Sequence, residues 1–128
     1  MILDTSAILA VIFHEPGYET LIEKLLAPGP RGVGAATLVE AGLVLTGRVQ
    51  GDAEALLRAT LQELEVVPVP FGQRHWRAAI EAFHRFGKGR HPAALNFGDC
   101  LSYATAKLAA RPLLFVGNDF GKTDLQAG

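Results

Sequence analysis

Residues Met1–Phe13, MILDTSAILAVIF, join a short apolar run to a longer one through a single acidic residue, Asp4. The first run is typical of a buried strand, and Asp4 is well placed to cap a helix that begins at Thr5. Asp4 is also the only charged residue in the stretch. Because a buried carboxylate without a partner costs several kcal/mol, the acid at this strand-to-helix junction needs an explanation.

The rest of the chain alternates between short apolar runs and longer segments with helical periodicity. The expected strands are residues 31–35, 65–69 and 112–117, and the expected helices are residues 18–27, 36–50, 53–64, 72–87 and a last one that begins at Asp99. This alternation predicts an α/β domain over residues 1–128, with three α/β/α layers around a mostly parallel sheet. Pro68 favours a strand end or a sheet edge, and the apolar segment 36–50 is expected to be a buried helix.

The composition limits the kinds of protein that the chain can be. Apolar residues make up 49% of 128 residues, which is enough for a real core, and the formal charge of −1 excludes a bulk polycation. The single cysteine, Cys100, excludes a disulfide framework and suits a reducing cytoplasm. No basic residue precedes the first apolar run as in a signal peptide, and no run reaches the roughly 18 residues that span a bilayer, so no membrane partner is expected.

Three further acids stand alone among apolar and neutral residues as Asp4 does. They are Glu40 within residues 32–47, Asp99 within residues 92–106 and Asp119 within residues 112–121. All four acids follow strands or lie near the starts of helices, and in a parallel sheet these places share one edge. The four carboxylates are therefore expected to converge, and a hard cation such as Mg²⁺ or Mn²⁺ would relieve their repulsion.

Each acid considered alone also has a purely structural explanation. Asp4 and Asp99 could be ordinary helix N-caps, and Asp119 could belong to ordinary turn chemistry after Asn118. Glu40 is the hardest to explain in this way, because an acid inside an apolar helix caps nothing. The four together favour a metal site over four unrelated structural acids.

Three segments, MILDTSAILA, ATLVEAGLVL and LNFGDCLSYATAKLAARPLLFVGNDFGKTDL, resemble in order the motifs of PIN-domain ribonucleases of the VapC toxin type. The resemblance covers residues 1 to about 125. It implies a three-layer fold, RNA cleavage with Mg²⁺ or Mn²⁺, a homodimer and an antitoxin partner. It places the catalytic, metal-binding acids at Asp4, Glu40, Asp99 and Asp119, and supporting polar groups at Ser6, Asn96 and Asn118.

RNA must reach this acidic edge on a slightly acidic protein, so a local basic patch is needed. The best basic feature is His84–His91, HRFGKGRH, in which Arg85, Lys88 and Arg90 could steer phosphates; a merely solvated loop is the simpler alternative. The helical spacing of Trp76 and Phe83 favours a place in the core or an interface over base stacking.

Other functional classes fit the residues less well. A phosphatase of the haloacid-dehalogenase type needs a second acid two residues after the first, where this chain has Ser6. A response-regulator receiver needs an acid pair near the first strand, and Asp4 stands alone. Two alternatives stay open within the resemblance: an RNA-processing PIN nuclease that is not a toxin, and a catalytically silent module that binds RNA or a partner.

Overall fold

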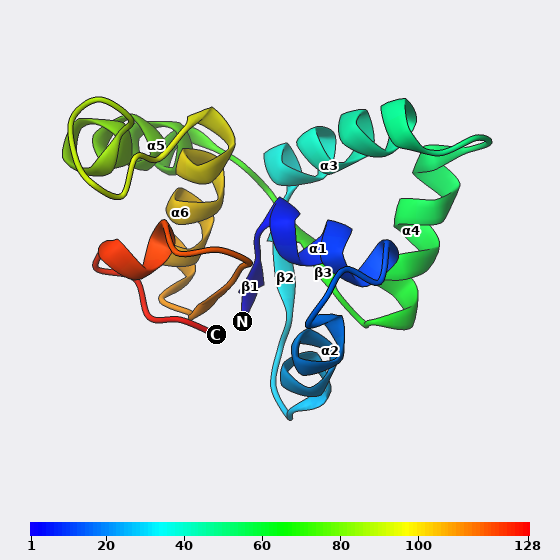
Figure 1. Ribbon diagram of the computed structural model, residues 1–128. Helices are drawn as coiled ribbons and strands as arrows, with labels where there is room; N and C mark the ends of the chain where they lie inside the picture. The colour runs from blue at the N-terminus through cyan, green and yellow to red at the C-terminus, as the bar shows by residue number, and fades with distance from the viewer.

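A computed structural model describes residues 1–128, and its centre is a sheet of four parallel strands (Figure 1). The strands are β1 (Ile2–Leu3), β2 (Gly32–Gly34), β3 (Val67–Val69) and β4 (Leu113–Leu114), in the order β3-β2-β1-β4. β1 therefore lies in the middle, between β2 and β4. β3 forms an edge, as Pro68 predicts, because a proline cannot donate a hydrogen bond to a further strand.

Six α-helices and one 3₁₀ turn surround the sheet. They are α1 (Thr5–Ile12), α2 (Tyr18–Leu26), α3 (Ala35–Arg48), α4 (Ala53–Glu63), α5 (Gln73–Phe86), α6 (Phe97–Ala109) and η1 (Phe120–Lys122). α1 to α4 lie on one side of the strands in Figure 1, and α5 and α6 lie on the other. None of these helices has the length and apolar character that crossing a membrane requires.

The sheet separates two hydrophobic cores, because successive strand residues point to opposite faces. Leu3, Val33 and Leu114 pack with the apolar residues of α1 to α4. Ile2 and Leu113 pack with residues of α5, α6 and the C-terminal segment. This arrangement confirms the three-layer α/β/α architecture, and the sheet is parallel throughout rather than only in most of its pairs.

Two expectations drawn from the sequence are corrected by the structure, and a third is narrowed. α6 begins at Phe97, two residues before Asp99, because Asn96 caps it. α3 is not a buried helix, since Val39 and Leu43 expose 62% and 69% of their surface. Trp76 is 49% exposed, so the structure excludes the core and leaves the other expected place, an interface.

Candidate active site

Asp4 directly follows β1 and caps α1, and hydroxyl groups hold its buried carboxylate. Asp4 Oδ2 accepts hydrogen bonds from the Ser6 backbone N–H at 3.1 Å and from Ser6 Oγ at 2.6 Å, and Oδ1 accepts one from Ser102 Oγ at 2.6 Å. The residue is only 5% exposed, and no cation contacts it. Its hydrogen bonds satisfy the carboxylate without neutralising its charge.

Ser6 connects the first and last strands of the site. Its Oγ donates to Asp4 and accepts a hydrogen bond from the backbone N–H of Val116 at 3.0 Å, just beyond β4. The hydroxyl therefore fixes both the orientation of the Asp4 carboxylate and the start of the turn that carries Asp119.

Glu40 lies on α3 and reaches the first turn of α6. The Thr5 hydroxyl donates a hydrogen bond to Glu40 Oε1. The carboxylate also lies against Gly98, where a Cβ atom would come within 2.0 Å of Glu40 Oε2 and 2.7 Å of Oε1. The absence of a side chain at Gly98 is what allows Glu40 to approach Asp99.

Asp99 is the third residue of α6 and shares a capping box with Asn96. The Asn96 backbone N–H donates to Asp99 Oδ2 at 3.0 Å, and the Asp99 backbone N–H donates to Asn96 Oδ1 at 2.9 Å. Asn96 is thus the N-cap in place of Asp99, and it holds the Asp99 carboxylate from the loop side. Only one oxygen of that carboxylate is used by the cap.

Asn118 and Asp119 are exposed in the turn between β4 and η1. The Asp119 side chain makes no capping hydrogen bond to η1 although it occupies the N-cap position. A purely structural cap therefore does not account for Asp119 in this structure.

The charges of the other three acids act on Asp99. The pKa of Asp99 is raised to about 6, first by burial and then by the negative charges of Asp4, Asp119 and Glu40, although the hydrogen bond from Asn96 lowers it. None of the four acids forms an ion pair, because the salt bridges of the chain involve other acids only. The fold therefore places uncompensated negative charge at the carboxyl edge of the sheet.

This donor set fits a hard divalent cation. The available ligands are carboxylate and hydroxyl oxygens, which Mg²⁺ and Mn²⁺ prefer. No three Asp, Glu, His or Cys side chains converge into a preformed cage. Such a cage is not required, since Mg²⁺ usually takes about one or two protein carboxylates and keeps several waters.

Four residues around the acids were not anticipated from the sequence. Thr5 and Gly98 position Glu40, Ser102 holds Asp4, and Thr37 lies 3.4 Å from Ser102 through their hydroxyl oxygens. Ser102 is three residues after Asp99 and so lies on the same face of α6. Helical spacing alone could have found it, whereas the contact of Glu40 with Gly98 depends on how two helices meet.

The three basic residues expected to steer RNA differ in whether an acid of the chain already pairs with them. Arg85 lies 3.7 Å from Asp124 and stacks over Phe86, with its guanidinium carbon 4.7 Å from the ring centre. Lys88 and Arg90 are exposed on the loop after α5. Lys88 and Arg90 form no such ion pair, so their charges are available to a phosphate.

Comparison with known proteins gives the same assignment at the level of family. The model of the PIN domain family matches residues 1–125. The chain is 45% identical to ribonuclease VapC36 of Mycobacterium tuberculosis, over 98% of this chain and 91% of that protein. It is 40% identical to a ribonuclease VapC of Mycolicibacterium smegmatis, over 99% and 98%.

Solved structures share the fold at low sequence identity. The toxin VapC20 of M. tuberculosis, described as cleaving the sarcin-ricin loop, is 17% identical with a TM-score of 0.76, and the match covers 97% of this chain and 95% of that one. VapBC2 of Rickettsia felis, bound to promoter DNA, is 15% identical with a TM-score of 0.78, covering 99% and 96%.

The raised pKa of Asp99 predicts how stability depends on pH without metal. Its folded-state pKa of about 6 exceeds the ordinary value of 3.8, so stability increases as the pH falls through this range and is lost as it rises. In a chelator, Asp99→Asn should therefore melt above wild type at about pH 7.5, with a smaller difference at about pH 5. Thermal unfolding of both proteins at the two pH values checks this. A variant that melts no higher than wild type at either pH would contradict it.

Proposed function

The chain belongs to the PIN-domain family and, within it, to the VapC ribonucleases, and on this premise we propose that it is a metal-dependent endoribonuclease, the toxin of a toxin–antitoxin pair. The observation that supports the metal site is the group of four acids around Asp99, none of which has a cation from the protein. The relatives named as VapC ribonucleases support the activity on RNA.

The proposed reaction is hydrolysis of an RNA phosphodiester bond, with 5′-phosphate and 3′-hydroxyl products as the family resemblance implies. A bound Mg²⁺ or Mn²⁺ would supply Lewis-acid polarisation of a phosphoryl oxygen and charge neutralisation. Asp4 and Asp99 are proposed to hold the cation directly or nearly so. Glu40 and Asp119 would bind waters, complete the site or orient the attacking water.

Positioning residues keep these acids in place. Ser6 and Ser102 fix both oxygens of Asp4, and Asn96 fixes Asp99. Cys100, next to Asp99, is not suited to be a nucleophile, because burial and the charge of Asp99 raise the pKa of its thiol to about 11. Attack by water is therefore favoured over a covalent intermediate on this cysteine.

The proposed protein partners are an antitoxin and a second copy of the chain. The antitoxin is supported by the toxin–antitoxin assemblies among the structural neighbours, and the homodimer by the family resemblance. A surface for such contacts exists where α3 meets α4, in a groove of about 570 Å³ that includes the exposed Val39 and Leu43. Contacts of this kind would cover the apolar side chains that α3 exposes.

Gly98→Ala should impair catalysis while the protein stays folded. The new methyl group would displace the end of the Glu40 side chain, and a shift of about 1 Å near reacting groups can cost roughly 10²-fold in rate. The measurement is the rate of RNA cleavage together with thermal unfolding.

Two controls make this prediction specific to Glu40. Gly42→Ala, on α3 itself, meets only Leu57 at 3.9 Å and should leave the rate unchanged. In a Glu40→Ala background, Gly98→Ala should cause little further loss, because the clashing carboxylate is gone. A full additional loss in that background would mean that Gly98 acts through something other than Glu40.

The proposed activity itself is tested by cleavage of structured cellular RNA with Mg²⁺, with Mn²⁺ and with a chelator. Asp4→Ala and Asp52→Ala form a matched pair, since both aspartates cap a helix with an oxygen about 3 Å from a backbone N–H. Each substitution should cost about 1 kcal/mol of capping. Asp4→Ala also removes the acceptor of the Ser6 and Ser102 hydroxyls and so should be the less stable variant, but it should stay folded, and only Asp4→Ala should abolish metal-dependent cleavage. Equal activity of the two variants would contradict the proposed site.

A further inference from the structure

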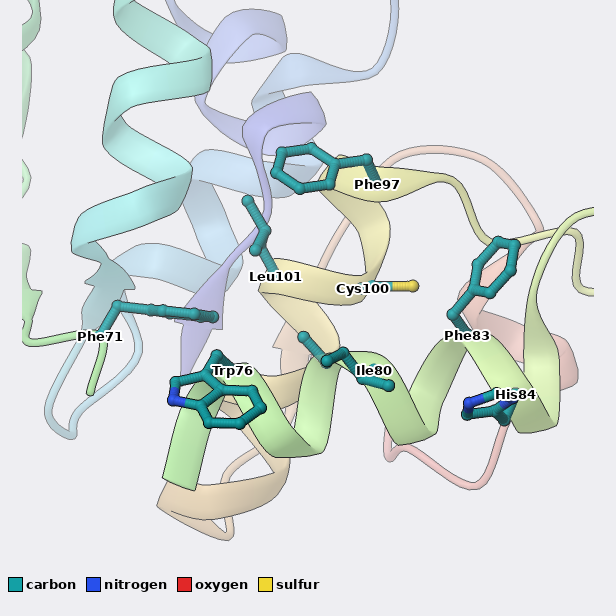
Figure 2. Close-up of a pocket in the computed structure, with 9 residues that line it drawn as sticks. Phe71, Trp76, Ile80, Phe83, His84, Phe97, Cys100 and Leu101 are labelled. Atoms are coloured by element: carbon teal, nitrogen blue, oxygen red, sulfur yellow. The ribbon is translucent and has the colours of Figure 1, made fainter. Parts of the chain in front are cut away.

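Helix α6 uses different faces for different contacts. Phe97 and Leu101 line an open apolar groove beside α5 (Figure 2). Asp99, Tyr103 and Lys107, by contrast, follow one another at intervals of four residues, and side chains at this spacing lie along one stripe of a helix. The stripe that begins with the proposed catalytic carboxylate of Asp99 therefore continues, over the next two turns, with a phenol and an amine.

The phenol and the amine of this stripe both bind Asp124, which follows η1 in the chain. Tyr103 Oη donates a hydrogen bond to Asp124 Oδ1 at 2.6 Å, and Lys107 Nζ donates one to Oδ2 at 2.7 Å. Arg85 of α5 adds an ion pair at 3.7 Å. Tyr103 is buried, and hydrogen bonds to a charged group are among the stronger ones. These four residues, here named the Asp124 latch, fasten the segment after η1 to two helices.

Backbone hydrogen bonds connect Asp124 back to Asp119 through η1. The Lys122 N–H donates to the Asp119 carbonyl at 3.2 Å, and the Thr123 N–H donates to the Phe120 carbonyl at 3.0 Å. Thr123 Oγ1 donates to the same carbonyl at 2.6 Å, and the Phe120 ring is buried. The stretch from Asp119 to Asp124 is therefore one hydrogen-bonded unit, and the latch holds its far end.

The carboxylate of Asp119 has no partner of its own in the protein. It is exposed, makes no hydrogen bond to η1 and forms no ion pair. Burial is the main cause of the raised pKa of Asp99, but the charge of Asp119 adds to it, so the turn lies within electrostatic reach of Asp99. The backbone on either side must therefore set the place of Asp119. Before the turn, Ser6 Oγ holds the Val116 N–H; after the turn, the latch holds the chain.

We propose that Tyr103 and Lys107 act as positioning residues for Asp119. By holding Asp124 they set where the Asp119 carboxylate stands relative to Asp99, and so set how tightly the group of four acids binds a divalent cation. The inference rests on the proposed metal-dependent function and adds to it two residues outside the four acids. A merely structural latch would stabilise the fold without changing the affinity for metal.

The first test is the affinity of the full chain for Mn²⁺, measured without RNA from the electron paramagnetic resonance signal of the free ion. Tyr103→Phe removes one hydroxyl and keeps the buried ring. It should weaken Mn²⁺ binding roughly fivefold, within the range for residues that act on a site through others. Tyr18→Phe, at the only other tyrosine, is the matched control. It lies on α2, across the sheet from the latch, and should bind Mn²⁺ like wild type (Figure 1).

Lys107→Met separates position from charge. Removing a positive charge near the site would, by Coulomb attraction alone, strengthen the binding of a cation. We expect the opposite, a weakening in the same direction as for Tyr103→Phe, because Asp124 loses one of its two hydrogen-bond donors. Leu21→Ala, in the core of α1 to α4, controls for stability: it should lower the melting temperature without weakening Mn²⁺ binding by the folded protein.

The dependence on Asp119 is tested in a second background. Asp119→Asn should itself weaken Mn²⁺ binding, and Tyr103→Phe should then cause no further loss, because the carboxylate that the latch positions is gone. An equal loss in both backgrounds would overturn the inference. Wild-type Mn²⁺ affinity in either single variant, or stronger binding by Lys107→Met, would overturn it as well.

Failure of this inference can be distinguished from failure of the proposed function. Mn²⁺ binding and metal-dependent RNA cleavage by wild type, with wild-type Mn²⁺ affinity in Tyr103→Phe, would keep the nuclease and leave the latch a structural contact. Absence of both Mn²⁺ binding and cleavage in wild type would remove the proposed function, and this inference with it.

Discussion

The candidate site is built around a buried carboxylate, Asp4, that hydrogen bonds hold in place and no cation of the protein contacts. It stands at the junction of the central strand β1 with α1, and it is bound by the hydroxyls of Ser6 and Ser102. Ser6 in turn holds the chain beyond β4. Hydroxyl donors satisfy hydrogen bonding but leave the negative charge, so the fold itself creates the demand for a cation.

Glu40 and Asp99 add their charges to that of Asp4, and separate local contacts position each of them. Gly98 makes room for Glu40, Thr5 orients it, and the Asn96 cap presents Asp99. Such an arrangement of like charges is costly by itself, and natural folds usually keep costs of this kind for functional sites.

Much of this arrangement could be predicted from the sequence, because it depends on local patterns. The alternation of apolar runs and helical segments predicts the layers, and the parallel sheet places the ends of β1 and β4 on the same edge. What could not be predicted depends on contacts between distant segments. The approach of Glu40 to Gly98 follows from the packing of α3 near α6, and the exposure of Trp76 follows from which face of α5 meets α6.

Direct binding of Mn²⁺ to the protein without RNA tests the central claim most directly. Free Mn²⁺ gives a six-line electron paramagnetic resonance signal that weakens when the ion is bound. The account predicts that wild type reduces the signal and that a variant with both Asp4 and Asp99 changed to Asn does not, although it stays folded. Equal signals with the two folded proteins would contradict the account and leave the four acids as caps and turns.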